Sequence, residues 1–360
     1  MNQLVVEQEK QIRIKDIAKR AGVSIGTVDR VLHKRGEVAE STREKILKII
    51  EELDYHPNYL ASILASNKTV TFATLFPEPP SPEGYWNKPF IGINKRMDEI
   101  RQYGVSIQPY TFSQSSAKSF IKEAGKIIEL KPDGVVFAPF FSKESKAFIN
   151  QLKGNNIPFV FIDSEIKAAG QLSYIGQNSF QSGLLAGKLL DSFTPGNNSI
   201  LVIHFAKEMD NQNHLVQREK GFYDWFDKKG SLKENIHTIE IGDTNAEGGW
   251  MENLYQIIIQ KNISGIFVTS SKVFYVARLI KKYQLKNICL IGHDLIKENV
   301  EYLKEGVVEF LLCQRPEEQG YNAVNKLFRH VIQKREVAKE NYTSIDIITK
   351  ENVDYYKGFK

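Results

Sequence analysis

The sequence has few of the features that mark secreted, membrane-spanning or metal-dependent proteins. It contains only two cysteines, Cys289 and Cys313, each inside an apolar run, so we expect buried strand residues in a reducing compartment and no disulfide. No run of 18 apolar residues is present, and the first residues lack the basic and apolar regions of a secretory signal. The seven histidines show no metal-ligand spacing, which predicts no metal site. We therefore expect a cytoplasmic protein without a membrane partner.

Sequence signatures of common enzymes are also missing. The chain has no GxxxxGK[ST], no GxGxxG and no HExxH motif, and nothing else in it predicts a cofactor. Gly22 to Gly26 formally matches G-x-S-x-G, but a helix is predicted before it, where a nucleophile elbow requires a strand. We expect no catalytic residues and no enzymatic activity.

Positive charge is concentrated near the N-terminus. Of the net charge of +5, the segment from Lys10 to Lys68 carries +4, with twelve Lys and Arg against eight Asp and Glu. A basic module joined to a near-neutral body suggests a polyanionic partner for that module. An ordinary solvated surface would explain the charge about as well.

Residues 12–53 predict three short helices. Apolar residues at helical spacing indicate helices at 15–21 and 25–33, and a third that opens with a capping box formed by Ser41 and Glu44. Gly22 allows a left-handed turn between the first two, and Ser24 can cap the second. This order is typical of a helix-turn-helix, although a three-helix bundle that binds no nucleic acid shows the same periodicity.

In a helix-turn-helix the N-terminal end of the second helix enters the major groove. The positions that point away from the three-helix core, and so could reach base edges, are Ile25, Gly26, Asp29 and Arg30. Arg30 can donate two hydrogen bonds to guanine, worth about 1–3 kcal/mol of discrimination. Ser24, Thr27 and Arg13 suit phosphate contacts.

The segment after this module predicts a short conditional helix. Asn58 can cap an apolar stretch from Tyr59 to Ser66, which is only about eight residues long. Isolated helices shorter than about 12–15 residues are marginal in water. We expect this stretch to fold only on DNA.

The run IRIKDIAKRAGVSIGTVDRVLHKRGEVAESTREKILKIIEELDYHPNYLASILAS resembles the headpiece of the LacI/GalR family of bacterial repressors. The resemblance implies dimers on near-palindromic DNA operators, with Ile25, Gly26 and Arg30 at base-reading positions. It also implies a hinge helix with Asn58 and Ala61, in which Leu64 is the wedge that enters the minor groove. The sequence departs from the family at Asp29, where serine is usual and where a carboxylate could accept from a cytosine amino group. It departs again at His33, which replaces an asparagine, and at Arg13, which replaces a capping Ser or Thr.

From Lys68 onward, strands alternate with amphipathic helices. The predicted strands are 70–76, 105–112, 134–138, 158–162, 200–204, 237–241, 265–269, 288–291 and 310–313. Helices are expected at 91–103, 116–130, 143–153, 179–193, 217–229 and 246–261. Such alternation predicts parallel sheets with helices on both faces, and there are enough strands for two sheets. The fold class we expect is an α headpiece followed by an α/β, two-lobed fold like that of periplasmic binding proteins, which the family resemblance also implies.

Ligands of open parallel sheets bind beyond the carboxyl ends of the strands. Polar and aromatic residues that follow predicted strands are therefore candidates for an effector site: Trp86, Phe90, Phe140, Asp163, Asp294 and Gln314. Arg218, in HLVQREKGF, resembles the family's effector-binding RxxGF element. Arg and Asp can bracket adjacent hydroxyls, and aromatic rings can cover a pyranose. Each residue alone could equally be structural. Together they predict a sugar or sugar-derivative effector, neutral or weakly acidic, since no second cation cluster indicates a phosphate.

We expect a headpiece at 1–57, a hinge at 58–68 and an effector-binding and dimerisation domain at 69–360. No leucine heptad follows the tail TSIDIITKEN, which reads as strand and loop, so we expect a homodimer and no tetramer. The predicted function is a DNA-binding repressor of carbohydrate-utilisation genes under allosteric control. The alternative is a solute-binding protein of a sugar transport system, which would share the body fold but would not need the headpiece.

Overall fold

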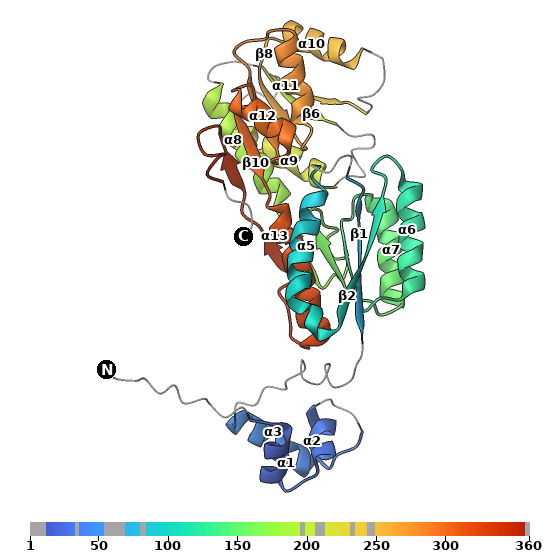
Figure 1. Ribbon diagram of the computed structural model, residues 1–360. Helices are drawn as coiled ribbons and strands as arrows, with labels where there is room; N and C mark the ends of the chain where they lie inside the picture. The colour runs from blue at the N-terminus through green and yellow to red at the C-terminus, as the bar shows by residue number, and fades with distance from the viewer. Residues whose placement is uncertain are drawn as a thin grey trace, which may run out of the picture. The chain divides into compact units, whose positions relative to one another are not determined.

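The structure is a computed structural model that describes residues 12–32, 36–53, 69–79, 84–194, 199–205, 213–230, 235–242 and 249–356. The chain divides into two compact units, residues 1–65 and 66–360. The first unit contains the three predicted helices, α1 (Ile14–Ala21), α2 (Ile25–Leu32) and α3 (Glu40–Glu52) (Figure 1).

The three helices enclose a small apolar core. Ile17, Val28 and Ile46, one from each helix, are fully buried against one another. An ion pair of 2.7 Å between Arg20 and Glu52 links α1 to α3 at the surface. The helical spacing seen in the sequence therefore identifies the inward faces correctly, except that Leu47 is half exposed.

Two of the three helix N-termini are capped by side chains. Ser24 Oγ accepts a hydrogen bond of 3.1 Å from the backbone amide of Thr27, which confirms the predicted cap of α2. On α1, the carboxylate of Asp16 accepts from the backbone amide of Arg13 at 2.8 Å. The predicted capping box on α3 is wrong, because the helix begins at Glu40 with Ala39 at the N-cap. Ser41 thus lies inside the first turn, two residues after the N-cap position, and cannot cap the helix.

The second unit has two lobes, each built on a six-stranded sheet. The N-lobe sheet has the order β11-β5-β4-β3-β1-β2, with all neighbours parallel. Its strands are β1 (Val70–Pro77), β2 (Val105–Phe112), β3 (Gly134–Phe137), β4 (Phe159–Ile162), β5 (Ser173–Gly176) and β11 (Glu340–Tyr342). Its helices are α5 (Asn87–Ile100), α6 (Ala117–Leu130), α7 (Ser142–Gly154) and α13 (Pro316–Leu327), with a 3₁₀ turn at Arg101–Tyr103 and a π-helical turn at Phe328–Ile332.

The C-lobe sheet has the order β12-β10-β9-β8-β6-β7, and only β12 is antiparallel to its neighbour. Its strands are β6 (Ser199–His204), β7 (Ile236–Glu240), β8 (Ile263–Val268), β9 (Cys289–His293), β10 (Phe310–Cys313) and β12 (Asp346–Ile348). Its helices are α8 (Ser179–Phe193), α9 (Asn213–Lys229), α10 (Trp250–Gln260), α11 (Val273–Lys282) and α12 (Lys297–Lys304).

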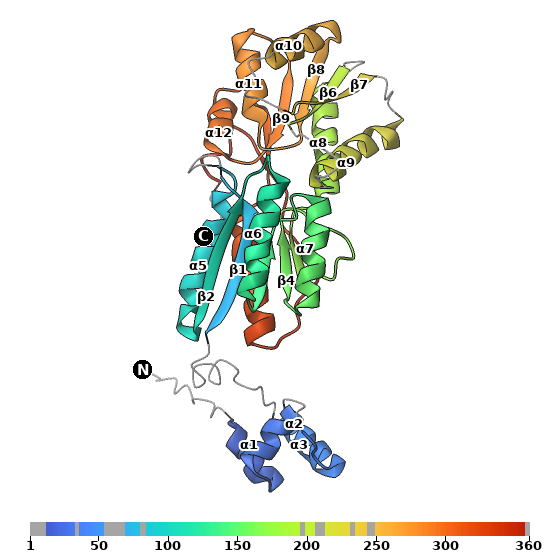
Figure 2. The same cartoon turned by 90° about the vertical axis from the view of Figure 1, so that its right-hand side faces the viewer.

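Helices cover both faces of each sheet, which explains why strands such as β3 and β4 are buried along their whole length. In the N-lobe, α6 and α7 lie on one face and α5 and α13 on the other (Figure 2). In the C-lobe, α8 and α9 pack on one face and α10, α11 and α12 on the other. The chain crosses between the lobes three times, after β5, after β10 and after β11. The predicted two-lobed α/β fold is thereby confirmed.

The sequence missed two strands. β5 and β11 have four and three residues, too few to show a period, and their pairing with each other depends on segments more than 160 residues apart. The tail was expected to contain a strand, and β12 is that strand. Both cysteines are free and lie in strands as predicted, although Cys289 is only partly buried.

Each lobe contains one very close pair of helices whose contact is made by glycines. In the C-lobe, a Cβ on Gly183 of α8 would lie 1.8 Å from the carbonyl oxygen of Arg218, and a Cβ on Gly221 of α9 would lie 1.9 Å from that of Phe180. In the N-lobe, Gly92 of α5 and Gly320 of α13 make the equivalent contact. The glycines of α8 and α9 therefore let these two helices approach closely.

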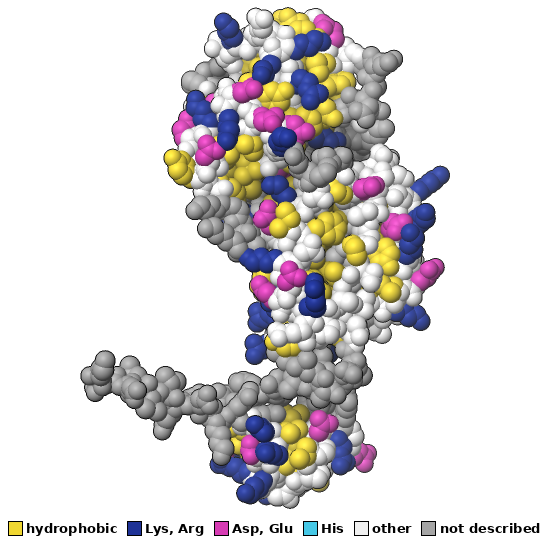
Figure 3. All heavy atoms as spheres, in the orientation of Figure 1, with side chains coloured by type: hydrophobic (Ala, Val, Ile, Leu, Met, Phe, Trp, Pro, Cys, Tyr) yellow, Lys and Arg dark blue, Asp and Glu magenta, His cyan; other side chains and the backbone are white. Residues whose placement is uncertain are grey.

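Lys and Arg are interspersed with Asp and Glu over the visible face of the body (Figure 3). Among the described residues, no helix is both long enough and apolar enough to cross a membrane.

Candidate functional site

The chain has two candidate sites, and the first is the N-terminal end of α2. Gly22 adopts a left-handed conformation (φ 69°), which turns the chain sharply between α1 and α2. Ile25, at the first position of α2, is 51% exposed although it is a large apolar residue. A Cβ on Gly26 would meet only Ser24 Oγ, at 3.8 Å, so the surface is open there. This end of α2 can therefore approach a flat or grooved partner closely.

Polar groups surround this open end. Arg30 is exposed, and its Nε donates to the carbonyl oxygen of Gly26 at 3.2 Å, which leaves the terminal guanidinium nitrogens directed outward. Ser24 and Thr27 share a hydroxyl hydrogen bond of 2.9 Å, and Arg13 is exposed. Asp29 is half-buried, with a partner of its own. The remaining predicted DNA-binding residues, His33, Asn58, Ala61 and Leu64, lie outside the described residues.

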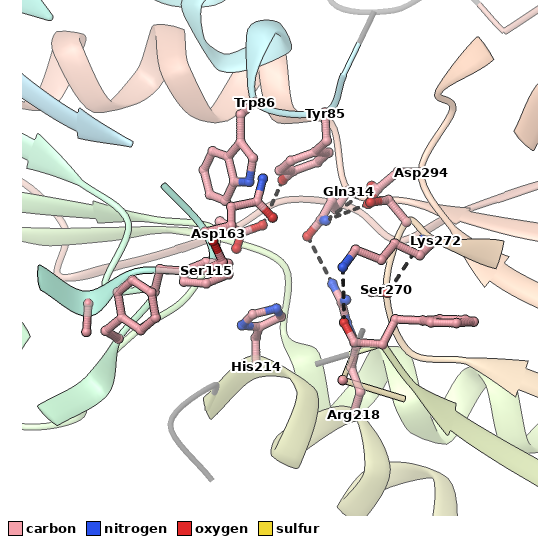
Figure 4. A pocket seen from close by; sticks show the side chains of 17 residues that line it. Tyr85, Trp86, Ser115, Asp163, His214, Arg218, Ser270, Lys272, Asp294 and Gln314 are labelled. Carbon is pink, nitrogen blue, oxygen red and sulfur yellow. Dashed lines mark hydrogen bonds between the residues drawn. The ribbon is translucent and has the colours of Figure 1, made fainter. Parts of the chain in front are cut away.

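The second candidate site is a cavity of about 270 Å³ between the two lobes (Figure 4). Six of the seven residues predicted for an effector site line it: Trp86, Phe140, Asp163, Arg218, Asp294 and Gln314. The seventh, Phe90, is not among the lining residues. It packs edge-on against Phe76, with ring centroids 5.3 Å apart, because the first turn of α5 directs it toward β1.

The two aspartates occupy equivalent places in the two lobes. Asp163 directly follows β4, and Asp294 directly follows β9. Both adopt left-handed backbone conformations (φ 66° and 68°), which is uncommon for residues other than glycine. Such strain is found where surrounding structure fixes a functional geometry, and here it directs both carboxylates into the space between the lobes.

Arg218 is the centre of the C-lobe wall. It is 2% exposed, and its Nη1 donates to the carbonyl oxygen of Thr269 at 2.7 Å. Its Nη2 donates to Oε1 of Gln314 at 3.1 Å, and Nε2 of Gln314 donates to both oxygens of Asp294 at 3.1 and 3.2 Å. Its Nε has no partner among the described residues. These hydrogen bonds fix the side-chain amide of Gln314 between the guanidinium of Arg218 and the carboxyl group of Asp294.

A second set of bonds joins the lobes. The Tyr85 hydroxyl donates to Asp163 Oδ1 at 2.7 Å, and the Asp163 amide donates to Gln319 Oε1 at 2.9 Å. Gln319 Nε2 in turn donates to the carbonyl oxygen of Gln314 at 2.8 Å. Asp163 is thus linked through Gln319 of α13 to Gln314, the residue that binds Arg218, so a series of hydrogen bonds joins the two lobes.

Sequence reasoning missed several lining residues, of which Tyr85, His214 and Lys272 are polar and chemically important. Lys272 follows β8 by four residues. The search for polar residues just after predicted strands could therefore have found it. His214 lies near the start of α9, four residues before Arg218. This spacing places both side chains on the same face of the helix, which could have identified His214 as a lining residue. Tyr85 precedes α5 by two residues and carries no pattern of its own.

Burial shifts the pKa values of the cavity groups. It raises the pKa of Asp294 from 3.8 to about 7, against the opposing effect of the nearby Arg218 charge. It lowers the pKa of His214 to about 4, so this imidazole is neutral at physiological pH. Burial, together with the charge of Asp163, holds the pKa of the Tyr85 hydroxyl well above its usual value, so it remains a donor. At neutral pH, His214 and Tyr85 therefore keep a single protonation state, whereas Asp294 titrates within this range.

The raised pKa of Asp294 predicts a pH-dependent stability. A carboxyl group whose pKa is higher in the folded state favours folding at low pH, and that contribution is lost as the pH rises through about 7. Asp294→Asn cannot ionise, so we expect its stability relative to the wild-type protein to increase by on the order of 2–3 kcal/mol between pH 5 and pH 8. Thermal unfolding of both proteins from pH 5 to 8 measures this. A stability difference that does not change with pH would contradict it.

Among the described residues, no group of His, Cys, Asp and Glu side chains is arranged to hold a metal ion.

Comparisons with known proteins match both units. The family "Bacterial regulatory proteins, lacI family" matches residues 13–58, and "Periplasmic binding protein domain" matches residues 74–335. Over 333 residues the chain is 26% identical to the HTH-type transcriptional repressor PurR of Erwinia tasmaniensis, covering 90% of this chain and 91% of that protein.

Solved structures agree with these matches. A Bacteroides fragilis protein assigned to the LacI transcriptional regulators is 31% identical, with a TM-score of 0.75, and the likeness covers 81% of this chain and 100% of that one. GanP, a glucose-galactose binding protein from Geobacillus stearothermophilus, is 22% identical with a TM-score of 0.69, covering 79% and 99%, which shows a shared fold. These relatives and the helix-turn-helix unit establish that the chain belongs to the LacI family and is a DNA-binding transcriptional regulator with a periplasmic-binding-protein body.

Proposed function

We propose that the protein binds a near-palindromic operator as a homodimer in the cytoplasm and that a sugar or sugar derivative between the lobes controls this binding. The observation that carries the proposal is the buried series Arg218–Gln314–Asp294, which faces Asp163 across the cavity. A guanidinium and two carboxylates at fixed positions can pair with adjacent hydroxyl groups of one small molecule. Regulation of carbohydrate-utilisation genes would follow from such an effector.

The apolar part of the cavity supports a sugar ring. Trp86 and Phe140 line it together with Phe141 and Phe205, so aromatic faces lie beside the polar groups. Ligand sites combine mostly apolar walls with a few placed polar groups, and aromatic rings can cover the C–H face of a pyranose. GanP, which shares the body fold, is a glucose-galactose binding protein.

The control mechanism that we propose uses the contacts of the effector with both lobes. A molecule held by Asp163 and Arg218 favours a closed cleft, which changes the orientation of the N-lobes in the dimer. The hinge, residues 58–68, is then no longer held in the arrangement that the operator requires. Linkage demands that effector and operator change each other's affinity by the same factor, whether the effector acts as inducer or corepressor.

The operator contacts that we propose come from the headpiece and from the hinge. Ile25, Gly26, Asp29 and Arg30 would read bases, with His33 beside them. Arg13, Ser24 and Thr27 would contact phosphates. Asn58, Ala61 and Leu64 would act in the hinge, with Leu64 wedged into the minor groove.

A thermal-shift screen of sugars and sugar acids on the full-length protein tests the effector site. A ligand that binds the folded body raises its melting temperature by mass action, by an amount that grows with ligand concentration. Hits are then added to a gel shift with the DNA upstream of the gene itself. If no compound changes both the melting temperature and the DNA affinity, the proposed control is wrong. A solute-binding protein, the alternative function, would show ligand binding but no sequence-specific shift.

Replacement of Arg30 tests the recognition helix. We expect Arg30→Ala to lose about 10- to 100-fold in affinity for its operator, since a bidentate contact to guanine is worth about 1–3 kcal/mol. Arg30→Lys is the matched control for charge, because it keeps the cation but loses the fork. Both variants should therefore lose specificity, whereas only Arg30→Ala should bind random DNA with a weaker salt dependence. Equal losses on operator and random DNA would remove Arg30 from base reading.

A further inference from the structure

The cavity contains a second cation that the sugar-binding network does not use. Lys272 follows the turn Ser270–Ser271 at the end of β8 and lies directly before α11. Its ammonium donates to the carbonyl oxygen of Phe205 at 3.3 Å. No carboxylate in the described part of the chain forms an ion pair with this ammonium, and Lys272 is half-buried in the cavity wall. An ammonium with a single neutral acceptor retains donors that a bound molecule could use.

The other charged groups of the cavity already have partners. Asp163 accepts from Tyr85, and Asp294 accepts from Gln314, which also occupies Arg218. Burial also raises the pKa of Asp294 to about 7, so this carboxyl carries only part of its charge at neutral pH. The C-lobe wall of the cavity carries two cations, Arg218 and Lys272, and one acid, Asp294, so this wall has an excess of positive charge among the described residues.

The turn that carries Lys272 is held rigidly. The Asn299 side chain, which is fully buried, donates to the carbonyl oxygens of Ser271, His293 and Asp294 at 2.9–3.0 Å. Its Oδ1 accepts from the backbone amide of Phe274 at 3.2 Å, which fixes the first turn of α11. Asn299 thereby ties the Ser270–Lys272 turn to the Asp294 loop. A pre-positioned cation flanked by two hydroxyls needs little reorganisation to bind an anion.

The two cations are also hydrogen-bonded to the ends of neighbouring strands. Arg218 is bonded to Thr269, directly after β8, and Lys272 is bonded to Phe205, directly after β6, and β6 and β8 pair in the sheet. In Figure 4 the Lys272 side chain extends into the cavity from the same wall as Arg218, opposite Tyr85 and Asp163. One molecule can therefore meet the hydroxyl-binding groups and Lys272 together.

We infer that the effector is an anionic sugar derivative, with a carboxylate or phosphate group seated against the Lys272 ammonium and the hydroxyls of Ser270 and Ser271. This inference rests on the proposed function, because it names the chemical class of the molecule that enters the same cavity. It modifies the expectation from the sequence, in which Lys272 was not recognised and a neutral sugar was equally suitable.

Binding of matched pairs to the full-length protein tests the charge preference. The probes are D-glucose, D-gluconate, D-glucuronate and D-glucose 6-phosphate, with the corresponding galactose compounds, measured by titration calorimetry. We expect at least one acid to bind about 10- to 100-fold more tightly than its neutral parent, the range typical of a hydrogen bond to a charged group. Whether carboxylates or phosphates benefit identifies the anionic group.

Variants of Lys272 separate this inference from the proposed function. Lys272→Met should remove the preference, so that the acid and its neutral parent bind this variant with similar affinity, and Lys272→Glu should reverse the preference. Lys286→Met, an exposed lysine of the same lobe, is the matched control and should change nothing. If neutral sugars bind as tightly as acids, or if Lys272→Met keeps the preference, the inference is overturned while the proposed function stands. If no compound of either class binds, both are overturned.

Discussion

Arg218→Ala is expected to abolish the response to any effector and to leave operator binding in place. The guanidinium connects Thr269, Gln314 and, through Gln314, Asp294, and it is the most deeply buried charge of the cavity wall. Its loss leaves the Gln314 oxygen and the Thr269 carbonyl without their donor and removes the contact to ligand hydroxyls. Truncating one partner of a buried charged hydrogen bond to a ligand commonly costs about 2–5 kcal/mol of binding free energy, which corresponds to about a 30-fold or larger loss of effector affinity.

Two further variants make this result interpretable. Arg278→Ala removes an exposed arginine of the same lobe that stacks near Phe274 and Tyr275, and its response should be normal. Arg218→Lys keeps the charge but cannot donate to Thr269 and Gln314 with a planar fork, so it should recover only a small part of the affinity. Effector titrations followed by gel shift measure all three proteins, with circular dichroism to confirm folding. A normal effector response in a folded Arg218→Ala protein would exclude Arg218 from the site.

Gly183→Ala is expected to destabilise the body strongly, because it adds a methyl group where the backbones of α8 and α9 are in contact. The new Cβ would lie 1.8 Å from the carbonyl oxygen of Arg218 and 2.6 Å from its carbonyl carbon, so α8 and α9 must separate. Overpacking against backbone typically costs about 1–3 kcal/mol and more where nothing can yield. Because α9 carries Arg218, the displacement should weaken effector binding as well.

Gly125→Ala is the matched control, since Gly125 lies within α6 and a Cβ there meets nothing within 4 Å. An alanine in the middle of a helix should stabilise the protein by about 0.5–1 kcal/mol relative to glycine. Thermal unfolding should therefore show opposite signs for the two substitutions, and calorimetry should show weaker effector binding only for Gly183→Ala. Equal melting temperatures for the two variants would mean that the α8–α9 contact is not as rigid as its geometry indicates.

Most of the elements could be predicted from the sequence because their signals are local. The apolar runs of β3, β4, β6 and β10 are continuous, as expected of strands covered on both faces, and the α8 pattern gives the observed bounds Ser179–Phe193. The short strands β5 and β11 have no such signal. They are strands because β4 and β5 offer open edges to them, which is a property of the assembled sheet.

The lining residues of the cavity could be predicted only where they directly follow a strand. Asp163, Asp294 and Gln314 each follow a buried strand, so the position of a ligand at the carboxyl ends of parallel strands identified them. Phe90 was predicted by the same argument, but its ring packs against Phe76 of β1. The direction of a helical side chain depends on how the helix is rotated about its own axis, and the sequence gives this rotation only approximately. Tyr85 lies in a loop whose sequence shows no helical or strand periodicity. Its place in the cavity is evident only from its hydrogen bond to Asp163.

The sequence by itself determined the helix-turn-helix and the alternation of strands and helices, because glycine turns, caps and apolar periods act over fewer than 20 residues. Only the tertiary structure decided which residues share the cavity. Arg218, Asp163, Lys272 and Gln314 are separated by up to 151 positions in the chain and meet because two sheets, linked by three crossovers, bring their strand ends face to face. Charge balance in such a place depends on burial and on which acids are already paired, and neither can be read along the chain.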